Sequence, residues 1–209
     1  RGTTLKDASG FERDGTYETF GGTYQLGLPG ALPDSGFAAG FSAGAAAVVS
    51  GEHFKSLESM TILLRMNAAR QNLGALISRP AEVIPGQGNQ DELVLFMNEG
   101  SLQLLANSEL FQSFEPISEN EWHHVALQID GIQQRLTVFI DGREAISTRI
   151  ALSSNDNDLY IGAYNAETGG YEGLIDDVLI FDRPLDPWEI DFLAFNTLPV
   201  NSSGFDLAK

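Results

Sequence analysis

The feature that most constrains the fold is an alternating pattern between residues 125 and 140. Large apolar residues occupy every second position there in two sets: Val125, Leu127 and Ile129, then Leu136, Val138 and Ile140. Asp-Gly pairs follow the two sets at residues 130–131 and 141–142. Asp and Gly tolerate the positive φ of tight hairpin turns, whose twist matches that of the flanking strands. The pattern therefore predicts antiparallel β-hairpins.

Several other segments carry strand patterns. Residues 59–67 are apolar on both faces, as in a strand buried inside the fold, and residues 73–78 read as its neighbour. Residues 92–97 and 102–106 flank an Asn-Glu-Gly-Ser turn and predict another hairpin. Further strands are expected between residues 21 and 44 and near residues 144–150, 159–163 and 174–181. Strands of this length and number suit two stacked antiparallel sheets.

One helix is expected, close to the end of the chain. Asp186 suits an N-cap and Pro187 suits the first helical turn, so residues 187–195 are predicted to be helical. Residues 80–90 contain two prolines and two glycines and predict a surface loop available for binding. Residues 198–209 lack periodicity and read as a tail, a linker or a last edge strand. A single domain is therefore expected over residues 1–197.

Composition and charge restrict the partners. Twelve basic and 29 acidic residues give a formal charge of −17, which repels nucleic acid and anionic lipid surfaces. No apolar run approaches the ~20 residues of a membrane span, so membrane insertion is not expected. The absence of cysteine excludes disulfides, thiol catalysis and thiolate metal sites. Because the sequence starts without a methionine, we expect it to be part of a larger multidomain chain.

Three motifs follow one another in a familiar order: Trp-His-His-Val-Ala at residues 122–126, Asp-Gly at 141–142 and Gly-Leu-Ile-Asp-Asp-Val at 173–178. They resemble the LamG-like branch of the concanavalin A-like jelly rolls. Residues 7–16 resemble the opening Asp-x-Ser-Gly loop of that family, and residues 37–50 resemble its second and third strands. With the helix signal, the resemblance implies an all-β, two-sheet antiparallel jelly-roll sandwich with one short C-terminal helix. It also implies a glycan-binding or adhesive module, often bound to calcium.

A calcium site is expected to join the two ends of the chain. The resemblance suggests Asp7, in an opening loop rich in Asp, Ser and Gly, together with Asp176 and Asp177. Calcium prefers six to eight oxygen ligands, which carboxylates and backbone carbonyls supply. Two adjacent aspartates in an apolar strand are costly unless a cation or hydrogen-bond donors compensate, so loop amides are the alternative partners. If the strand alternates regularly, only one aspartate faces a given site, and the resemblance favours Asp176.

A glycan site is expected on the Gly-rich loop of residues 163–173. Aromatic rings cover the apolar faces of sugars, while carboxylates and amides bind hydroxyl groups. The candidate ligand-binding residues are Tyr164, Asn165, Glu167 and Tyr171. Local packing is the alternative role of the two tyrosines.

Glycanase chemistry is disfavoured. The string Glu-Ile-Asp-Phe-Leu-Ala at residues 189–194 approximates the signature of concanavalin A-like glycanases. Those enzymes need the acids on one face of a strand, with two carboxylates ~5 Å apart. On a helix, Glu189 and Asp191 point about 200° apart, and Ala194 stands where the final acid is required.

Two further constellations are not expected to be sites. Because His123 and His124 are adjacent on a strand, they face opposite sides and cannot chelate one metal. Residues 155–167 imitate an EF-hand, but Ile161 stands where its glycine is needed, so residues 159–163 are read as a strand. Trp122 should lie on the face opposite Val125, either packed or exposed to a sugar.

The sequence as a whole predicts a non-catalytic carbohydrate-binding or adhesion module of a secreted or cell-surface protein, stabilised by calcium. Its partner would be a glycan or an extracellular protein. The alternative is a structural or protein-interaction spacer of the same fold, and a glycan-active enzyme is a remote third. Exposed loop aromatics would favour sugar binding, and a large flat apolar patch would favour protein adhesion.

Overall fold

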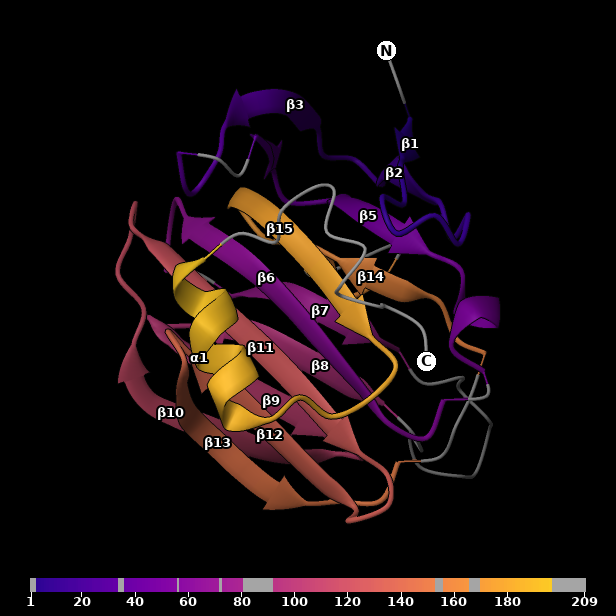
Figure 1. The fold of residues 1–209 in the computed structure, drawn as a ribbon. Helices are drawn as coiled ribbons and strands as arrows, with labels where there is room; N and C mark the ends of the chain where they lie inside the picture. Colours follow the sequence, from indigo (N-terminus) through magenta and orange to yellow (C-terminus); the bar gives the residue numbers. More distant parts are fainter. Residues whose placement is uncertain are drawn as a thin grey trace.

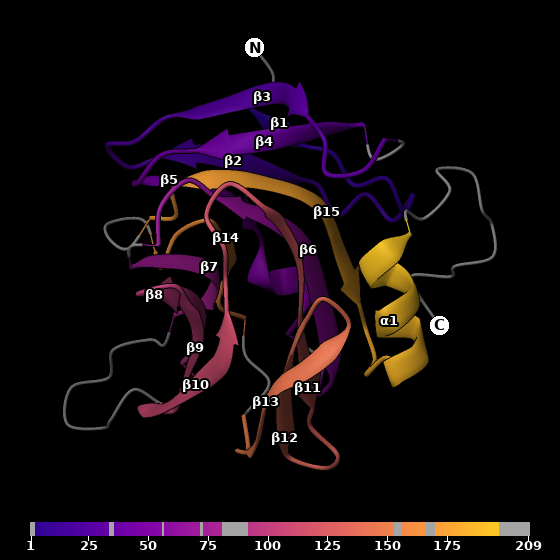
Figure 2. The ribbon, with the colours of Figure 1, turned by 90° about the vertical axis from the view of Figure 1, so that its left-hand side faces the viewer.

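The computed structural model shows a sandwich of two antiparallel sheets with one helix outside it (Figure 1). Figure 2 shows the sheets side by side, with helix α1 (Pro187–Phe195) against the outer face of one sheet. The predicted jelly-roll sandwich is confirmed. The structure describes residues 3–33, 36–55, 57–71, 73–80, 92–152, 156–165 and 170–196.

The two sheets contain seven and eight strands. The seven-stranded sheet has the order β13 (Arg143–Arg149), β12 (Arg135–Ile140), β11 (Trp122–Asp130), β6 (Met60–Ala68), β15 (Gly173–Phe181), β4 (Phe37–Phe41) and β3 (Tyr24–Pro29). The eight-stranded sheet has the order β1 (Thr4–Leu5), β2 (Gly15–Thr19), β5 (Ala45–Val49), β14 (Leu159–Ile161), β7 (Gly74–Arg79), β8 (Leu93–Asn98), β9 (Ser101–Ala106) and β10 (Glu109–Pro116). A short 3-10 helix, η1 (Gly51–His53), follows β5.

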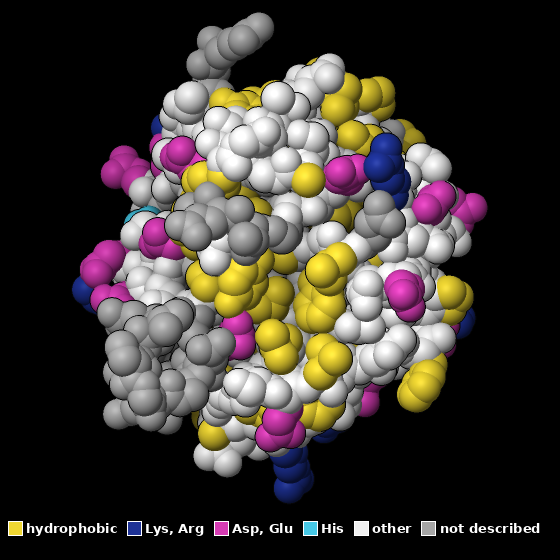
Figure 3. Space-filling view, turned by 180° about the vertical axis from the view of Figure 1, so that it is seen from behind, with side chains coloured by type: hydrophobic (Ala, Val, Ile, Leu, Met, Phe, Trp, Pro, Cys, Tyr) yellow, Lys and Arg dark blue, Asp and Glu magenta, His cyan; other side chains and the backbone are white. Residues whose placement is uncertain are grey.

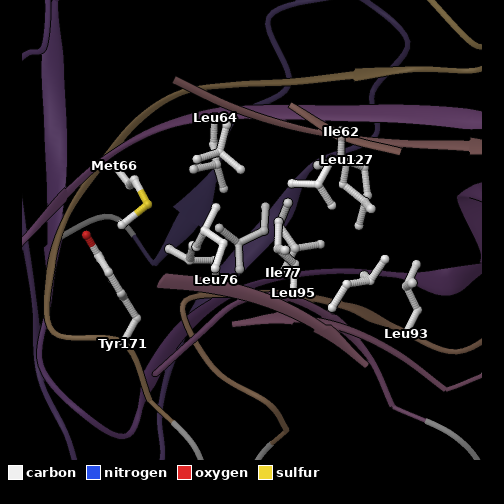
Figure 4. Close-up of a cluster of buried hydrophobic side chains, with 14 of the residues drawn as sticks. Ile62, Leu64, Met66, Leu76, Ile77, Leu93, Leu95, Leu127 and Tyr171 are labelled. Atoms are coloured by element: carbon white, nitrogen blue, oxygen red, sulfur yellow. The ribbon is translucent and has the colours of Figure 1, made fainter. Parts of the chain in front are cut away.

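The main core fills the space between the sheets. Figure 4 shows Leu64 and Leu127 of the seven-stranded sheet facing Leu76 and Leu95 of the eight-stranded sheet. These side chains are inaccessible to solvent, and burying one such leucine contributes about 1.5–3 kcal/mol. The apolar positions of the alternating pattern, including Leu127, point into this core as predicted.

Two predicted hairpin turns have the expected geometry. Asp141 and Gly142 connect β12 to β13 with φ values of 49° and 80°. Glu99 and Gly100 connect β8 to β9 with φ values of 49° and 75°. Positive φ at both central residues is the mark of the type I′ turn that suits strand twist.

The predicted turn at residues 130–131 differs from a two-residue hairpin. Asp130 is still paired with Arg135, so four residues form the loop between β11 and β12. The Asp130 carboxylate accepts a hydrogen bond from the Gln133 amide at 2.9 Å. The aspartate therefore closes a longer turn through its side chain, which an Asx-type bond allows.

Strands β6 and β7 are not neighbours, contrary to the sequence-based expectation. β6 lies between β11 and β15, while β7 lies between β14 and β8 in the other sheet. Both faces of β6 are buried as predicted, because Leu64 enters the main core and Leu63 lies in a second apolar cluster. An apolar pattern on both faces indicates burial but does not select a pairing partner.

Helix α1 covers the outer face of the seven-stranded sheet. The second apolar cluster lies between them and contains Leu63, Ala126, Phe139, Phe181, Leu185, Ile190 and Leu193. The Asp186 amide donates to Glu189 Oε2 at 2.8 Å, so the predicted helix start is confirmed. Among the described residues, no helix has the length and apolar character of a membrane span. No α-helix among the described residues covers the outer face of the eight-stranded sheet.

Candidate functional site

The candidate site is a row of side chains across the outer face of the eight-stranded sheet. Strand register places one residue of each of six strands opposite the next, and we call this set the outer row: Leu110, Leu105, Val94, Ser78, Tyr160 and Val48. Their chain neighbours, such as Leu104 and Leu95, belong to the main core, so the outer row points away from it. At ~4.8 Å between strands, five intervals make the row about 24 Å long.

This face is apolar near its middle. Figure 3 shows hydrophobic side chains gathered there, surrounded by polar and acidic groups. Leu110 is 59% exposed, Leu105, Tyr160 and Val48 are partly exposed, and Val94 and Ser78 between them are buried. Phe96 lies two residues after Val94 on the same face, where Gln103 and Gln112 continue its ladder. The face thus combines a flat apolar strip with amide groups.

Tyr164 lies over the centre of this face. The Ser78 hydroxyl donates to the Tyr164 carbonyl oxygen at 2.7 Å, and the Tyr164 hydroxyl donates to Glu92 Oε1 at 2.6 Å. Burial and the neighbouring Glu92 carboxylate raise the pKa of Tyr164 to about 12, so the phenol keeps its proton at neutral pH. Ser78 of β7 therefore holds the Tyr164 main chain, and Glu92, just before β8, holds the phenol of this partly exposed ring. Tyr164 is the predicted ligand residue that the structure places on this face.

Two exposed acidic residues lie beside Tyr160. Burial raises the pKa of Tyr160, and the negative charges of Asp158 and Glu18 raise it further. The Asp158 carboxylate also accepts a hydrogen bond from the Gly51 amide at 2.9 Å. It belongs to the segment leading into β14, so the strand interpretation of this region is confirmed in place of an EF-hand. Sequence reasoning missed Tyr160, whose alternation with buried Leu159 and Ile161 was the available signal.

Tyr171 was expected at a ligand site, but the structure places it in the core. Its side chain is fully buried beside Met66 (Figure 4). The Tyr171 amide donates to the Gly162 carbonyl at 2.8 Å, which returns the chain from the loop to the sandwich. Asn165 is partly exposed and follows Tyr164 directly, whereas Glu167 lies outside the described residues. The Gly-rich loop thus combines a surface tyrosine with a core tyrosine.

Asp7 closes its own loop. Its carboxylate accepts hydrogen bonds from the Ser9 amide and hydroxyl at 2.8 and 2.7 Å, and from the Arg13 amide at 3.0 Å. Partial burial pushes the pKa of Asp7 upward, but these donors outweigh it and the pKa lies below its usual value. The loop amides therefore stabilise the ionised carboxylate.

A β-bulge in β15 breaks the alternation expected at Asp176 and Asp177. Asp176 is paired with Arg65 and Leu179 with Leu63, so two residues of β15 oppose one residue of β6. Asp177 has a φ of 47°, which is unusual for a residue other than glycine. The bulge brings both carboxylates to the α1 side of the sheet, and the expectation that only one of them faces a given side is wrong.

Hydrogen-bond donors meet both aspartates. The Ala31 amide donates to Asp176 Oδ2 at 2.8 Å, and the Asp177 amide donates to Asp176 Oδ1 at 2.9 Å. Arg65 Nε donates to Asp177 Oδ2 at 3.0 Å. Burial and the charge of Asp176 raise the pKa of Asp177, which Arg65 opposes. The cost of burying Asp176 and partly burying Asp177 is thus offset by amides and one guanidinium group.

The three predicted calcium ligands do not form one cluster. In the described part of the chain, no three His, Asp or Glu side chains gather as metal ligands. Asp7 is a residue of the loop between β1 and β2, whereas Asp176 and Asp177 belong to β15 in the other sheet. Each of these carboxylates accepts hydrogen bonds from protein donors. Calcium binding stays a prediction.

The paired histidines have different surroundings. His123 Nδ1 lies 2.8 Å from Asp141 Oδ2, and the Ser118 amide donates to His123 Nε2. His124 is buried beside Arg65, and its Nδ1 has no hydrogen-bond partner in the described structure. Burial and the charge of Arg65 lower the pKa of His124 to about 4. The two rings therefore differ, because both nitrogens of His123 have hydrogen-bond partners and Nδ1 of His124 has none in the described structure.

Glu189 is part of the framework of α1. Arg183 Nη2 donates to Glu189 Oε1 at 2.7 Å, and this hydrogen bond lowers the pKa of Glu189 despite burial. The residue lies on a helix, as predicted, and the carboxylate is committed to the helix start. It is not arranged as a glycanase acid.

Comparison with solved structures finds domains of the same fold. Domain 4 of AbnA, a GH43 extracellular arabinanase from Geobacillus stearothermophilus, was solved with arabinotriose; it has a TM-score of 0.66 and 18% identity, and the match covers 92% of this chain and 97% of that domain. The CBM40 of the Ruminococcus gnavus IT-sialidase, bound to α2,3-sialyllactose, has a TM-score of 0.57 and 14% identity, with coverage of 85% and 100%. Trypanosoma rangeli sialidase has a TM-score of 0.65 and 14% identity, with coverage of 93% of this chain and 31% of the enzyme.

The sequence comparisons concern the family. No curated protein sequence matches the chain significantly. A family model described as the concanavalin A-like lectin/glucanases superfamily matches residues 41–191. This match covers well over half of the chain and includes strands from both sheets. The chain therefore belongs to the concanavalin A-like lectin/glucanase superfamily.

Proposed function

We propose that this chain is a non-catalytic carbohydrate-binding module that holds a glycan on the outer face of the eight-stranded sheet. The observation that carries the proposal is Tyr164, an aromatic ring fixed by Ser78 and Glu92 over an apolar strip. Sugars present apolar C–H faces to aromatic rings and hydroxyl groups to amides and carboxylates. The outer row and its flanking side chains supply both kinds of contact.

The structural neighbours support this assignment at the level of whole domains. The match extends over 97% of the arabinanase domain solved with arabinotriose and over all of the module bound to sialyllactose. Each of those neighbours is therefore a complete domain of the size described here. We extend glycan binding from them to this chain as part of the proposal.

A binding role without catalysis agrees with the contacts of Glu189, because its carboxylate already accepts hydrogen bonds from Arg183 and from the Asp186 amide at the helix start. The sialidase match covers only 31% of that enzyme, so it concerns one part of a larger protein. We place the chain in a secreted or cell-surface protein with further domains, where a module of this kind would keep its parent near a glycan.

Protein adhesion is the second candidate function, and one observation favours it. Trp188, Phe192 and Phe195 follow one another at helical spacing on α1 and are 65%, 45% and 65% exposed. Aromatic side chains are enriched at protein interfaces. This stripe and the glycan face lie on opposite sides of the sandwich, so single substitutions separate the two functions.

Calorimetry with an oligosaccharide selected on a glycan array tests the proposal. Tyr164→Ala should weaken binding about tenfold or more, because a central aromatic anchor commonly contributes over 1.4 kcal/mol. Tyr164→Phe keeps the ring and should lose less. Trp188→Ala, on the far side, should bind as the parent chain does. Unchanged binding in Tyr164→Ala with a loss in Trp188→Ala would overturn the assignment of the face.

A further inference from the structure

The outer face of the eight-stranded sheet carries acids without matching cations. The outer row continues from Val48 to Thr16 and then to Thr4 in the neighbouring strands. No described residue of this extended row is Lys or Arg. The ladder through Gln112, Gln103 and Phe96 has none either. Within these two ladders a ligand therefore meets no basic side chain, and Lys6, two residues after Thr4, is paired with Asp14.

Acidic side chains surround the same strip. Glu18 and Asp158 are exposed, and both are close enough to Tyr160 to raise its pKa. Glu92 lies under the Tyr164 hydroxyl at 2.6 Å. The whole chain adds a formal charge of −17, so the long-range field has the same sign as the local one.

The basic groups near this end of the sheet are engaged elsewhere. Lys55, next to η1, pairs with Glu52. Arg79 is buried, lies over the Phe54 ring and donates to the Asn157 carbonyl oxygen. Neither is a ready partner for the carboxylate of an anionic sugar.

We propose that the ligand is an uncharged oligosaccharide that lies across the strands along the outer row, an inference that rests on the proposed function. Its hydroxyl groups would donate to Glu18 and Asp158, because hydrogen bonds to ionised acceptors are the stronger kind. Its apolar ring faces would cover Tyr160, Tyr164 and Leu105. A sialic acid or uronic acid would bring a carboxylate against these same acids, with no cation to offset the repulsion.

Calorimetry with two matched ligand sets tests this inference. Uncharged oligosaccharides, such as arabinotriose and xylotetraose, are compared with α2,3-sialyllactose and oligogalacturonate, at low salt and at 150 mM salt. The best uncharged ligand should bind at least tenfold more tightly than the best anionic one, and its affinity should depend little on salt.

A charge reversal gives the second arm. Glu18→Lys should strengthen binding of the anionic set at least threefold, while Asp191→Lys on α1, which changes the net charge equally, should not. If anionic ligands bind the parent chain as tightly as uncharged ones, or more tightly, the inference of an uncharged ligand is wrong, while the proposal of glycan binding stands. Binding of neither set, with the fold confirmed by circular dichroism, would overturn the proposed function itself.

Discussion

The two outer faces of the sandwich differ, because α1 packs on the seven-stranded sheet and no described α-helix packs on the eight-stranded sheet. On the seven-stranded sheet, Leu63, Ile190 and Leu193 exclude solvent beneath α1. On the eight-stranded sheet, Leu110 and Tyr160 stand in register on the same ladder and stay accessible. Apolar side chains buried under a helix stabilise the fold. Substituting solvent-exposed apolar side chains changes the free energy of unfolding little, and such side chains can contact a ligand. One face is therefore packed against a helix, whereas the other keeps Leu110 and Tyr160 accessible.

A charged residue on each face gives the largest contrast in stability. Leu193→Asp would bury a carboxylate without a partner under α1 and should lower the free energy of unfolding by about 4 kcal/mol. Leu110→Asp, at a side chain that is 59% exposed, should change it by about 0.5 kcal/mol or less. Urea denaturation measures both. Similar losses in the two variants would mean that the outer face of the eight-stranded sheet is also structural.

Calcium binding would stabilise the folded state. Binding only the folded state at a hundredfold excess over Kd contributes about 2.7 kcal/mol, so a chelator should lower the Tm and calcium should restore it. Asp176→Asn should remove most of that shift, while Asp156→Asn should not. A Tm indifferent to chelator would show that the Ala31 amide and Arg65 suffice for the two aspartates of the bulge.

Acid should loosen the helix-covered face through His124. Its pKa in the fold is about 4, below the value of about 6.5 for an unfolded histidine, so the unfolded state binds the proton first. Stability is then present above pH 6.5 and is lost as the pH falls toward 4, by about 2 kcal/mol between pH 7 and 5. His124→Gln should flatten this slope in urea titrations.

The neighbouring histidine provides the control. The hydrogen bond to Asp141, against an opposing effect of burial, raises the pKa of His123. Its contribution is therefore full below pH 6.5 and is lost as the pH rises through the folded pKa. His123→Gln should steepen the loss of stability in acid. A His124→Gln variant whose stability changes between pH 7 and 5 as much as that of the parent chain would contradict the burial of a neutral His124.

Local signals predicted much of the fold. The alternation around Leu127, the turn at Asp141 and Gly142, and the helix start at Pro187 are each encoded within a few residues. The turn at Asn107 and Ser108 was missed because it contains no glycine, although both residues have positive φ. The two apolar strands β6 and β7 were placed side by side because burial says nothing of which sheet a strand joins.

The candidate site was predicted only in part. Tyr164 was identified from loop composition, but Tyr160, Leu105 and Leu110 come together through the register of six strands, which no local pattern encodes. Tyr171 was misjudged because a loop tyrosine and a core tyrosine look alike in sequence. The bulge at Asp177 depends on how β15 fits against β6, so its effect on the two aspartates appears only in the structure.

Amide chemical-shift mapping would locate a bound glycan on one of the two outer faces. An oligosaccharide selected by array is titrated into the labelled chain. We expect the shifted amides to cluster in β8, β9 and β14 and around Tyr164, on the outer face of the eight-stranded sheet. Shifts confined to α1 and the strands beneath it would contradict glycan binding on that face.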